Sequence, residues 1–104
     1  MSQPKLLTLP DVTATLANTA YQLTATVTPA SSIAIQGKAS NAGVVYIGDS
    51  NVAAGRGLEV QPGDILEIDG PLIRGVSEEL YLSDLYISAP NAGDKVKVVY
   101  FGKR

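Results

Sequence analysis

The amino-acid sequence predicts a single all-β domain, either a compact β-sandwich or a jelly-roll-like barrel of short antiparallel strands. Apolar and polar residues alternate in many segments, which is the pattern of a strand with one buried face. Gly, Pro, Asn and Asp interrupt these segments at intervals of about 8–12 residues, which is typical of a sandwich or barrel. The chain of 104 residues has the length of one domain, so we place a single β domain at 1–104.

The expected strands follow from this alternation and from a β-branched composition. In 21–27, for example, Leu23, Ala25 and Val27 share one face, opposite three polar residues. Eight segments are expected to form strands: 5–9, 21–27, 32–36, 44–47, 58–60, 65–68, 84–88 and 95–101. Residues 12–16 are a candidate for a further strand.

Turn signals indicate how these strands connect. The segments 37–43 and 90–94 are rich in turn-forming residues, and each is expected to close a hairpin between the strands on either side. Pro62 and Gly63 stand at the second and third positions of a four-residue turn. This is the chemistry of a type II turn, because Gly accepts the positive φ at the third position. Two alternatives stay open within 72–83, a short helical turn and a strand.

Charge and composition exclude several classes of function. The net charge is −2 and only 17% of residues are charged, against a usual share of about 25%. We expect no nucleic-acid binding, since that function needs a basic face. Low charge is typical of surfaces that partners cover. The chain has no Cys and no His, which removes disulfides, thiolate metal sites and the usual general base.

No targeting segment is recognised in the sequence. The residues that follow the initial Met-Ser-Gln-Pro-Lys form no apolar signal-peptide core. No apolar run approaches the roughly 20 residues that are needed to span a bilayer. We therefore expect synthesis in the cytoplasm and no contact with a membrane.

The segment Gly48-Asp49-Ser50 follows an apolar stretch and resembles the nucleophile block of the GDSL/SGNH hydrolases. In that family a Ser attacks an ester carbonyl, and the reaction needs a His to accept the Ser proton. This chain has no His, and it is short for the parallel α/β sheet of that family. We therefore interpret 48–50 as a polar turn, assign no catalytic residue and expect no enzyme.

The remaining polar and aromatic residues are interpreted as structural. The Asp and Glu residues lack the spacing of an EF-hand, so we treat them as solvated surface charges and assign no metal ligand. The Gly-rich loop 48–57 lacks the phosphate-binding motifs, so we expect no cofactor. The five Tyr residues and Phe101 are expected mainly in the core or at subunit interfaces.

Five segments carry a resemblance to a class of short proteins encoded among tailed-phage structural genes. They are 33–36 (IAIQ), 43–50 (GVVYIGDS), 56–64 (RGLEVQPGD), 82–87 (LSDLYI) and 96–100 (VKVVY). The class shares this order of strand and turn motifs, over residues 20–101 of the present chain. The pair Gly37-Lys38 departs from the pattern, because the class often has Asn and a small polar residue there.

Members of this class are generally taken to be virion components such as capsid decoration proteins. The resemblance therefore implies a non-enzymatic structural component of a phage virion, made in the host cytoplasm. A capsid decoration or cement protein that stabilises the head by symmetric surface contacts is the first expectation. The implied partners are the major capsid protein or other virion proteins, and further copies of the chain. A homotrimer is expected first, because capsid lattices offer local three-fold axes.

Two alternatives to a decoration protein stay open. A neck or tail accessory structural protein would differ only in its position in the particle. A carbohydrate-binding, adhesin-like β-module would need exposed aromatic residues on one face. The chain has no Trp, and aromatic residues make up only 6% of it.

The N-terminal segment 1–10 is a candidate contact arm. Leu6, Leu7 and Leu9 lie in an apolar stretch that precedes Pro10, and we name these three as candidate contact residues. An edge strand of this kind satisfies its backbone groups by pairing with a neighbouring subunit or with the capsid shell. The alternative is that the stretch forms the first strand of its own sheet.

Overall fold

Strands make up nearly all of the regular structure of this chain. The computed structural model describes residues 6–26, 28–69, 72–73, 76–77 and 80–102. Its elements, in chain order, are β1 (Leu6–Thr13), β2 (Tyr21–Gln22), β3 (Pro29–Gly37), β4 (Val45–Gly48), β5 (Leu58–Val60), β6 (Ile65–Asp69), β7 (Leu72–Ile73), β8 (Val76–Ser77), β9 (Leu80–Tyr81), the 3₁₀ turn η1 (Leu82–Asp84), β10 (Tyr86–Ser88) and β11 (Lys95–Gly102). The predicted all-β class is confirmed.

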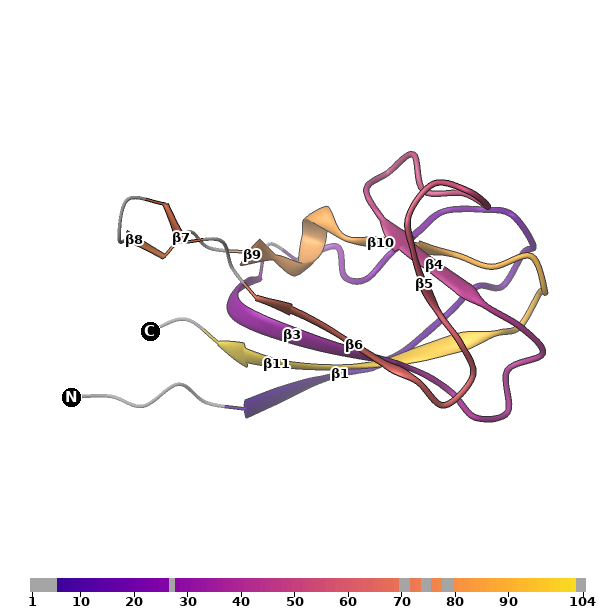
Figure 1. Cartoon of the computed structure of the whole chain (residues 1–104), viewed down its shortest axis with the longest axis horizontal. Helices are drawn as coiled ribbons and strands as arrows, with labels where there is room; N and C mark the ends of the chain where they lie inside the picture. Colours follow the sequence, from indigo (N-terminus) through magenta and orange to yellow (C-terminus); the bar gives the residue numbers. More distant parts are fainter. Residues whose placement is uncertain (1–5, 27, 70–71, 74–75, 78–79, 103–104) are drawn as a thin grey trace.

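The strands form two antiparallel sheets that lie face to face (Figure 1). Sheet A has the order β1-β11-β3-β6, with β9 also paired to β3. Sheet B has the order β2-β10-β4-β5. Strands β7 and β8 pair with each other in a small separate hairpin. The arrangement is the β-sandwich that the sequence predicts.

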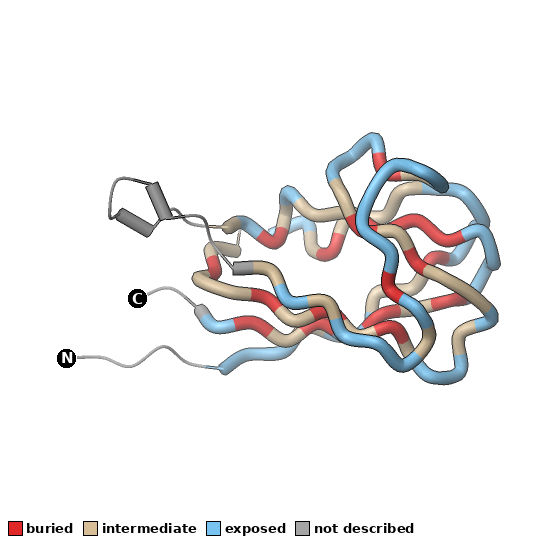
Figure 2. The backbone as a smooth tube through the Cα atoms, in the orientation of Figure 1, coloured by how far each residue is buried: buried red, intermediate tan, exposed pale blue. Residues whose placement is uncertain are grey.

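The core lies between the two sheets, where alternate residues of the central strands point inward. On neighbouring strands of sheet A, Tyr100 pairs with Ile33 and Val98 pairs with Ile35. Sheet B contributes further buried apolar side chains, Val45, Ile47, Val60 and Ile87. Figure 2 shows the resulting alternation of buried and less buried positions along β3 and β11. The alternation of apolar and polar residues that predicted these strands thus matches the alternation of buried and less buried positions in the structure.

The connections between β3 and β4 and between β10 and β11 are two of those that cross from one sheet to the other. The sequence predicts hairpins at 37–43 and 90–94, and both predictions are wrong. Strands β3 and β4 lie in different sheets, and so do β10 and β11. Each crossing takes a polar segment over the end of the core, where its backbone groups need hydrogen-bond partners.

Asn41 and Asp94 supply partners where the two crossings meet. The Asn41 side chain donates from Nδ2 to the carbonyl of Lys95 at 2.8 Å and accepts from the Lys95 N–H at 2.9 Å. The buried Asp94 carboxylate accepts from the N–H groups of Ala42 at 2.8 Å and Gly43 at 3.1 Å. These four bonds hold the crossings together, so a turn-rich composition serves here to join the sheets.

The strand predicted at 21–27 is much shorter in the structure. It ends at Gln22, and Leu23 is buried whereas Ala25 is exposed. Thr24 Oγ1 accepts from the N–H of Thr26 at 3.3 Å. Such local side-chain bonds compete with a sheet ladder, so the Thr-rich segment bends away from sheet B.

The first strand is longer than predicted. It continues through Pro10 to Thr13, so the predicted stop at Pro10 is wrong, and the start of the strand proposed at 12–16 belongs to β1. The register with β11 shifts between Leu9 and Val12. This bulge accommodates Pro10, which has no N–H to donate to the ladder.

Of the two alternatives for 72–83, the strand that opens at Leu80 is present in the structure. Leu80 and Tyr81 pair with β3 as a strand, and the 3₁₀ turn Leu82–Asp84 follows directly. The Glu78 and Glu79 positions, where a helical turn was an option, lie outside the described residues, as do Lys5 and Val27.

The type II turn predicted between β5 and β6 agrees with the structure. The N–H of Asp64 donates to the carbonyl of Gln61 at 3.0 Å, and Gly63 has a φ of +85°. A side chain at Gly63 would be strained by this φ alone, because no atom lies within 4 Å of where its Cβ would be.

Ile35→Ala should lower the free energy of unfolding by about 2–5 kcal/mol, because it leaves a cavity beneath a central strand. Ile35 has 0% exposure, whereas Ile65 on the adjacent strand β6 is 60% exposed and serves as the matched control. Ile65→Ala should cost no more than about 0.5 kcal/mol. Urea denaturation followed by circular dichroism measures both values, and equal losses would contradict this placement of the core.

Candidate functional site

Strand β1 carries the candidate contact residues and forms one edge of sheet A. It pairs with β11 in antiparallel register, from Leu6 opposite Phe101 to Thr13 opposite Lys95. Among the described residues, no strand pairs with its other side. Residues 6–9 therefore belong to the protein's own sheet and also present an open edge.

The three leucines of β1 differ in how they are placed. Leu6 is 58% exposed, and Leu7, whose register partner is the buried Tyr100, is still 37% exposed. Leu9 is half-buried and packs against the core. The structure therefore leaves Leu6 and Leu7 accessible to a partner, on opposite faces of the sheet, while Leu9 already has contacts within the chain.

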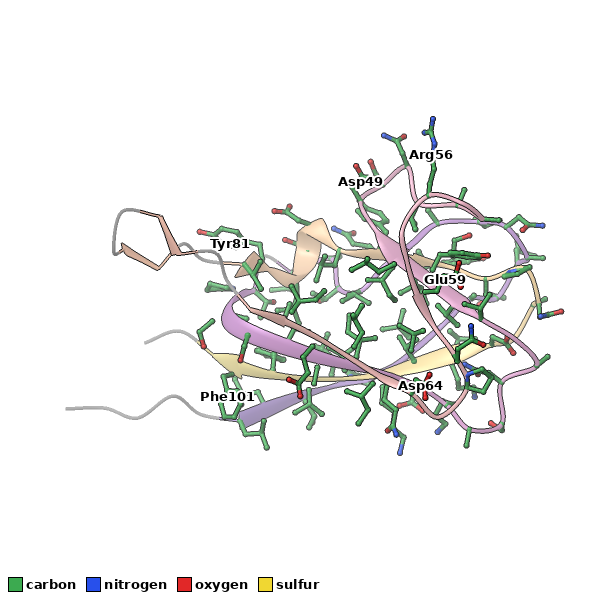
Figure 3. All side chains as sticks on the ribbon, in the orientation of Figure 1. Asp49, Arg56, Glu59, Asp64, Tyr81 and Phe101 are labelled. Atoms are coloured by element: carbon green, nitrogen blue, oxygen red, sulfur yellow. The ribbon has the colours of Figure 1, made fainter. Side chains whose placement is uncertain are left out.

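The outer face of sheet A, away from sheet B, carries an apolar patch next to Leu6. We define the outer patch as Leu6, Ala34, Val99 and Phe101. Phe101 is 42% exposed, and Figure 3 shows it on the side of sheet A opposite sheet B. The residues of the patch, with Ser32, Ile33 and Glu67, line a shallow hollow of about 170 Å³. No second layer covers this face within the described part of the chain.

The sequence analysis named Phe101 only as a core or interface residue and missed the patch. A signal for it was present, since 98–101 is apolar at four consecutive positions. In a strand, consecutive apolar residues place apolar side chains on both faces. Val98 and Tyr100 fill the inner face, so Val99 and Phe101 must face outward.

The second half of β1 is held by an ion pair. Asp11 accepts a hydrogen bond from Lys38 Nζ at 3.0 Å, across the start of the first crossing. This hydrogen bond lowers the pKa of the Asp11 carboxyl, and the charges of Lys97 and Lys95 act in the same direction. The ion pair with Lys38 lies in the half of β1 that is farther from Leu6.

The segment Gly48-Asp49-Ser50 forms a tight turn at the end of β4. Asp49 accepts from the N–H of Asn51 at 2.9 Å, and Ser50 is exposed. Asp49 and Arg56 project outward from this loop (Figure 3). A Cβ at Gly57 would lie 2.7 Å from the carbonyl oxygen of Ile47, and Gly57 has a φ of +140°. The hydrogen bond of Asp49 and the close approach at Gly57 give both residues a structural role in the turn.

The carboxylates do not gather into a cation site within the described residues. Asp94 is the buried one, and both of its oxygens already accept backbone N–H groups. Its role, with Asn41, is one that the sequence analysis missed. The sequence could not show which groups these two residues bond, because they lie in separate turn-rich segments that come together only in the fold.

The aromatic residues are divided between the core and several surfaces. Tyr100 is part of the core, and the Tyr21 hydroxyl accepts from the N–H of Leu16 at 2.9 Å. The exposed Tyr81 and Phe101 lie on opposite sides of sheet A (Figure 3). These two side chains therefore do not form a common stacking platform.

Comparisons with models of protein families, with curated proteins and with solved structures found no match to this chain. In the described part of the chain, no helix has the length and apolar character needed to cross a membrane.

Lys38→Ala should raise the pKa of Asp11 toward its ordinary value of 3.8, since the bond to Lys38 is the largest cause of the lowering. Because the pKa of Asp11 is lower in the folded state than in the unfolded state, the ion pair with Lys38 stabilises the fold at pH values above the unfolded-state pKa. This stabilisation is lost as the pH falls through the folded pKa. Titration of the carboxyl ¹³C shift by NMR measures the change. Lys97→Ala, the matched control, should produce a smaller rise, and an unchanged pKa in Lys38→Ala would contradict the ion pair.

Proposed function

We propose that this protein is a non-enzymatic structural component of a tailed-phage virion, and specifically a capsid decoration protein. The observation that carries the proposal is the resemblance of its five strand and turn segments to short phage structural proteins. Those segments coincide with β3, β4, β5, β10 and β11 and their turns, which form the framework of both sheets. The resemblance thus includes strands of both sheets, whereas β1 lies outside it.

The surface of the protein supports a role in contacts rather than in chemistry. The outer patch offers apolar side chains on the outer face of sheet A, and Leu6 joins it to the open edge of β1. Residues of this type suit the centre of a protein interface, where charge is depleted. We propose the major capsid protein, or another virion protein, as the partner of this patch.

A single contact through the four residues of the outer patch is weak, because specific interfaces usually bury at least about 1,200 Å² in total. A virion compensates by repetition, since many identical copies bind to a symmetric lattice and each linked contact strengthens the others. The proposal therefore includes self-association of the chain, which the sequence analysis expects as a trimer. A decoration protein needs no cofactor and binds neither nucleic acid nor membrane.

The proposal predicts where the chain is found in its own phage. Virions purified from that phage should contain the protein in a copy number set by the symmetry of the shell, as measured by quantitative mass spectrometry. A cryo-EM map should show the two-sheet domain at repeated positions on the head. Density at the neck or tail would overturn the decoration role in favour of an accessory one, and absence from the virion would overturn both.

A substitution tests the contact surface. Purified protein should bind to heads that lack it, and Phe101→Lys should reduce the affinity at least about tenfold, because it buries a charge in an apolar contact. Ile65→Lys is the matched control, since Ile65 is 60% exposed on β6, at the edge of sheet A opposite β1. Co-sedimentation with heads measures binding, and circular dichroism verifies folding. Equal binding of Phe101→Lys and wild type would contradict the use of this patch.

A further inference from the structure

Among the described strands, β2, β5 and β6 form sheet edges that have features which disfavour edge-to-edge pairing. An open strand invites another strand unless it is very short or charged. Strands β2 and β5 have two and three residues, and β5 carries the exposed Glu59. Strand β6 begins after the exposed Asp64 and contains the exposed Glu67, so two copies of this edge would repel each other.

The edge of β1 lacks this protection over four residues. The strand has eight residues, and only its second half contains a Pro, a bulge and a charged residue. The first half, Leu6-Leu-Thr-Leu9, has no charge and no Pro. Its backbone groups on the open side have no strand partner in the described chain.

Apolar side chains are exposed on both faces of this same edge. Leu6 belongs to the outer face and Leu7 to the inner face, where it extends past the reach of sheet B. A strand added beside β1 would place its alternate side chains next to both leucines. Such a strand would therefore bury apolar surface on the two faces while it satisfies the open backbone groups.

The sequence around β1 is symmetric about Leu7. Pro4 and Pro10 each stand three positions away from it. In an antiparallel pair of two β1 strands centred on Leu7, each Leu7 faces the other and each Leu6 faces Thr8. Pro10 lies beyond these facing positions, so it does not interrupt them, and the residues of each pair point to the same face of the joined sheet.

We propose that two copies of this chain associate through antiparallel pairing of β1, centred on Leu7, so that their two A sheets become one continuous sheet. The contact is isologous, because each copy contributes the same segment. This inference identifies a second copy of the chain as the partner of β1. It rests on the proposed function only in assuming that β1 makes a contact. A two-fold contact builds a dimer, in place of the trimer that the sequence analysis expects.

Single cysteines test the register, because the chain has none of its own. Residues directly opposite each other have Cα atoms about 4.5–5.5 Å apart, which a disulfide bridges. Leu7→Cys should therefore form a disulfide-linked dimer on mild oxidation. Thr8→Cys is the matched control, since two Thr8 positions are diagonal, at about 7–8 Å, and should cross-link at least about tenfold more slowly. A mixture of Leu6→Cys and Thr8→Cys should give the mixed dimer.

Sedimentation of the untagged chain over a range of concentrations tests the association itself. Wild type should show a reversible monomer–dimer equilibrium, and Leu7→Lys should weaken it at least about tenfold, because a charge blocks the edge. Ile65→Lys, on the opposite edge, should leave it unchanged.

Three results would overturn the inference. One is a wild type that stays monomeric at all concentrations, and another is Thr8→Cys cross-linking as fast as Leu7→Cys. The third is an oligomer that Leu7→Lys leaves intact. A monomer in solution that still binds heads, and loses this binding with Leu7→Lys, would show that the shell occupies the edge instead. The proposed function would then stand while the dimer is rejected.

Discussion

The antiparallel pairing of β3 with β11 is the interaction on which the other parts of the structure depend. It runs from Val96 opposite Gly37 to Gly102 opposite Ala30, so it spans nearly the full length of both strands. Its inner side chains form the floor of the core, and β1 and β6 attach to its two sides. Because the strands come from distant parts of the chain, this pairing also brings the two crossings together. Asn41 bonds the backbone of Lys95, and Asp94 bonds the backbone of Ala42 and Gly43, where the two crossings lie side by side.

Strands with a clear period of two could be predicted from the sequence, whereas their partners could not. The burial of Ile33 and Ile35 follows from local alternation, which acts within a few residues. The two wrong hairpins show the limit of this reasoning. A turn-rich link has the same composition whether it reverses the chain within one sheet or crosses to the other. The crossings are held by hydrogen bonds that the Asp94 carboxylate accepts from the N–H groups of Ala42 and Gly43. These bonds join residues far apart in sequence, so local composition does not reveal them.

The candidate site was predictable to a similar extent. An apolar edge strand near the N-terminus follows from the residues before Pro10, and the structure has one there. The division of roles among its leucines does not follow from sequence, because it depends on how far sheet B extends over sheet A. Leu9 lies near the core, whereas Leu6 and Leu7 lie beyond it. The outer patch likewise needs the register that places Phe101 beside Leu6. The proposed contacts therefore lie on a part of the described sandwich that the second sheet leaves uncovered.

The central claim is that two copies of this sandwich pair through the open edge of β1. Hydrogen exchange of the backbone amides, measured by NMR at low and high protein concentration, tests it most directly. Amides of Leu6–Leu9 that point away from β11 should exchange more slowly as the concentration rises, because a second strand protects them. Amides on the open side of β6 should exchange at the same rate throughout. Exchange at Leu6–Leu9 that is fast and independent of concentration would contradict the account.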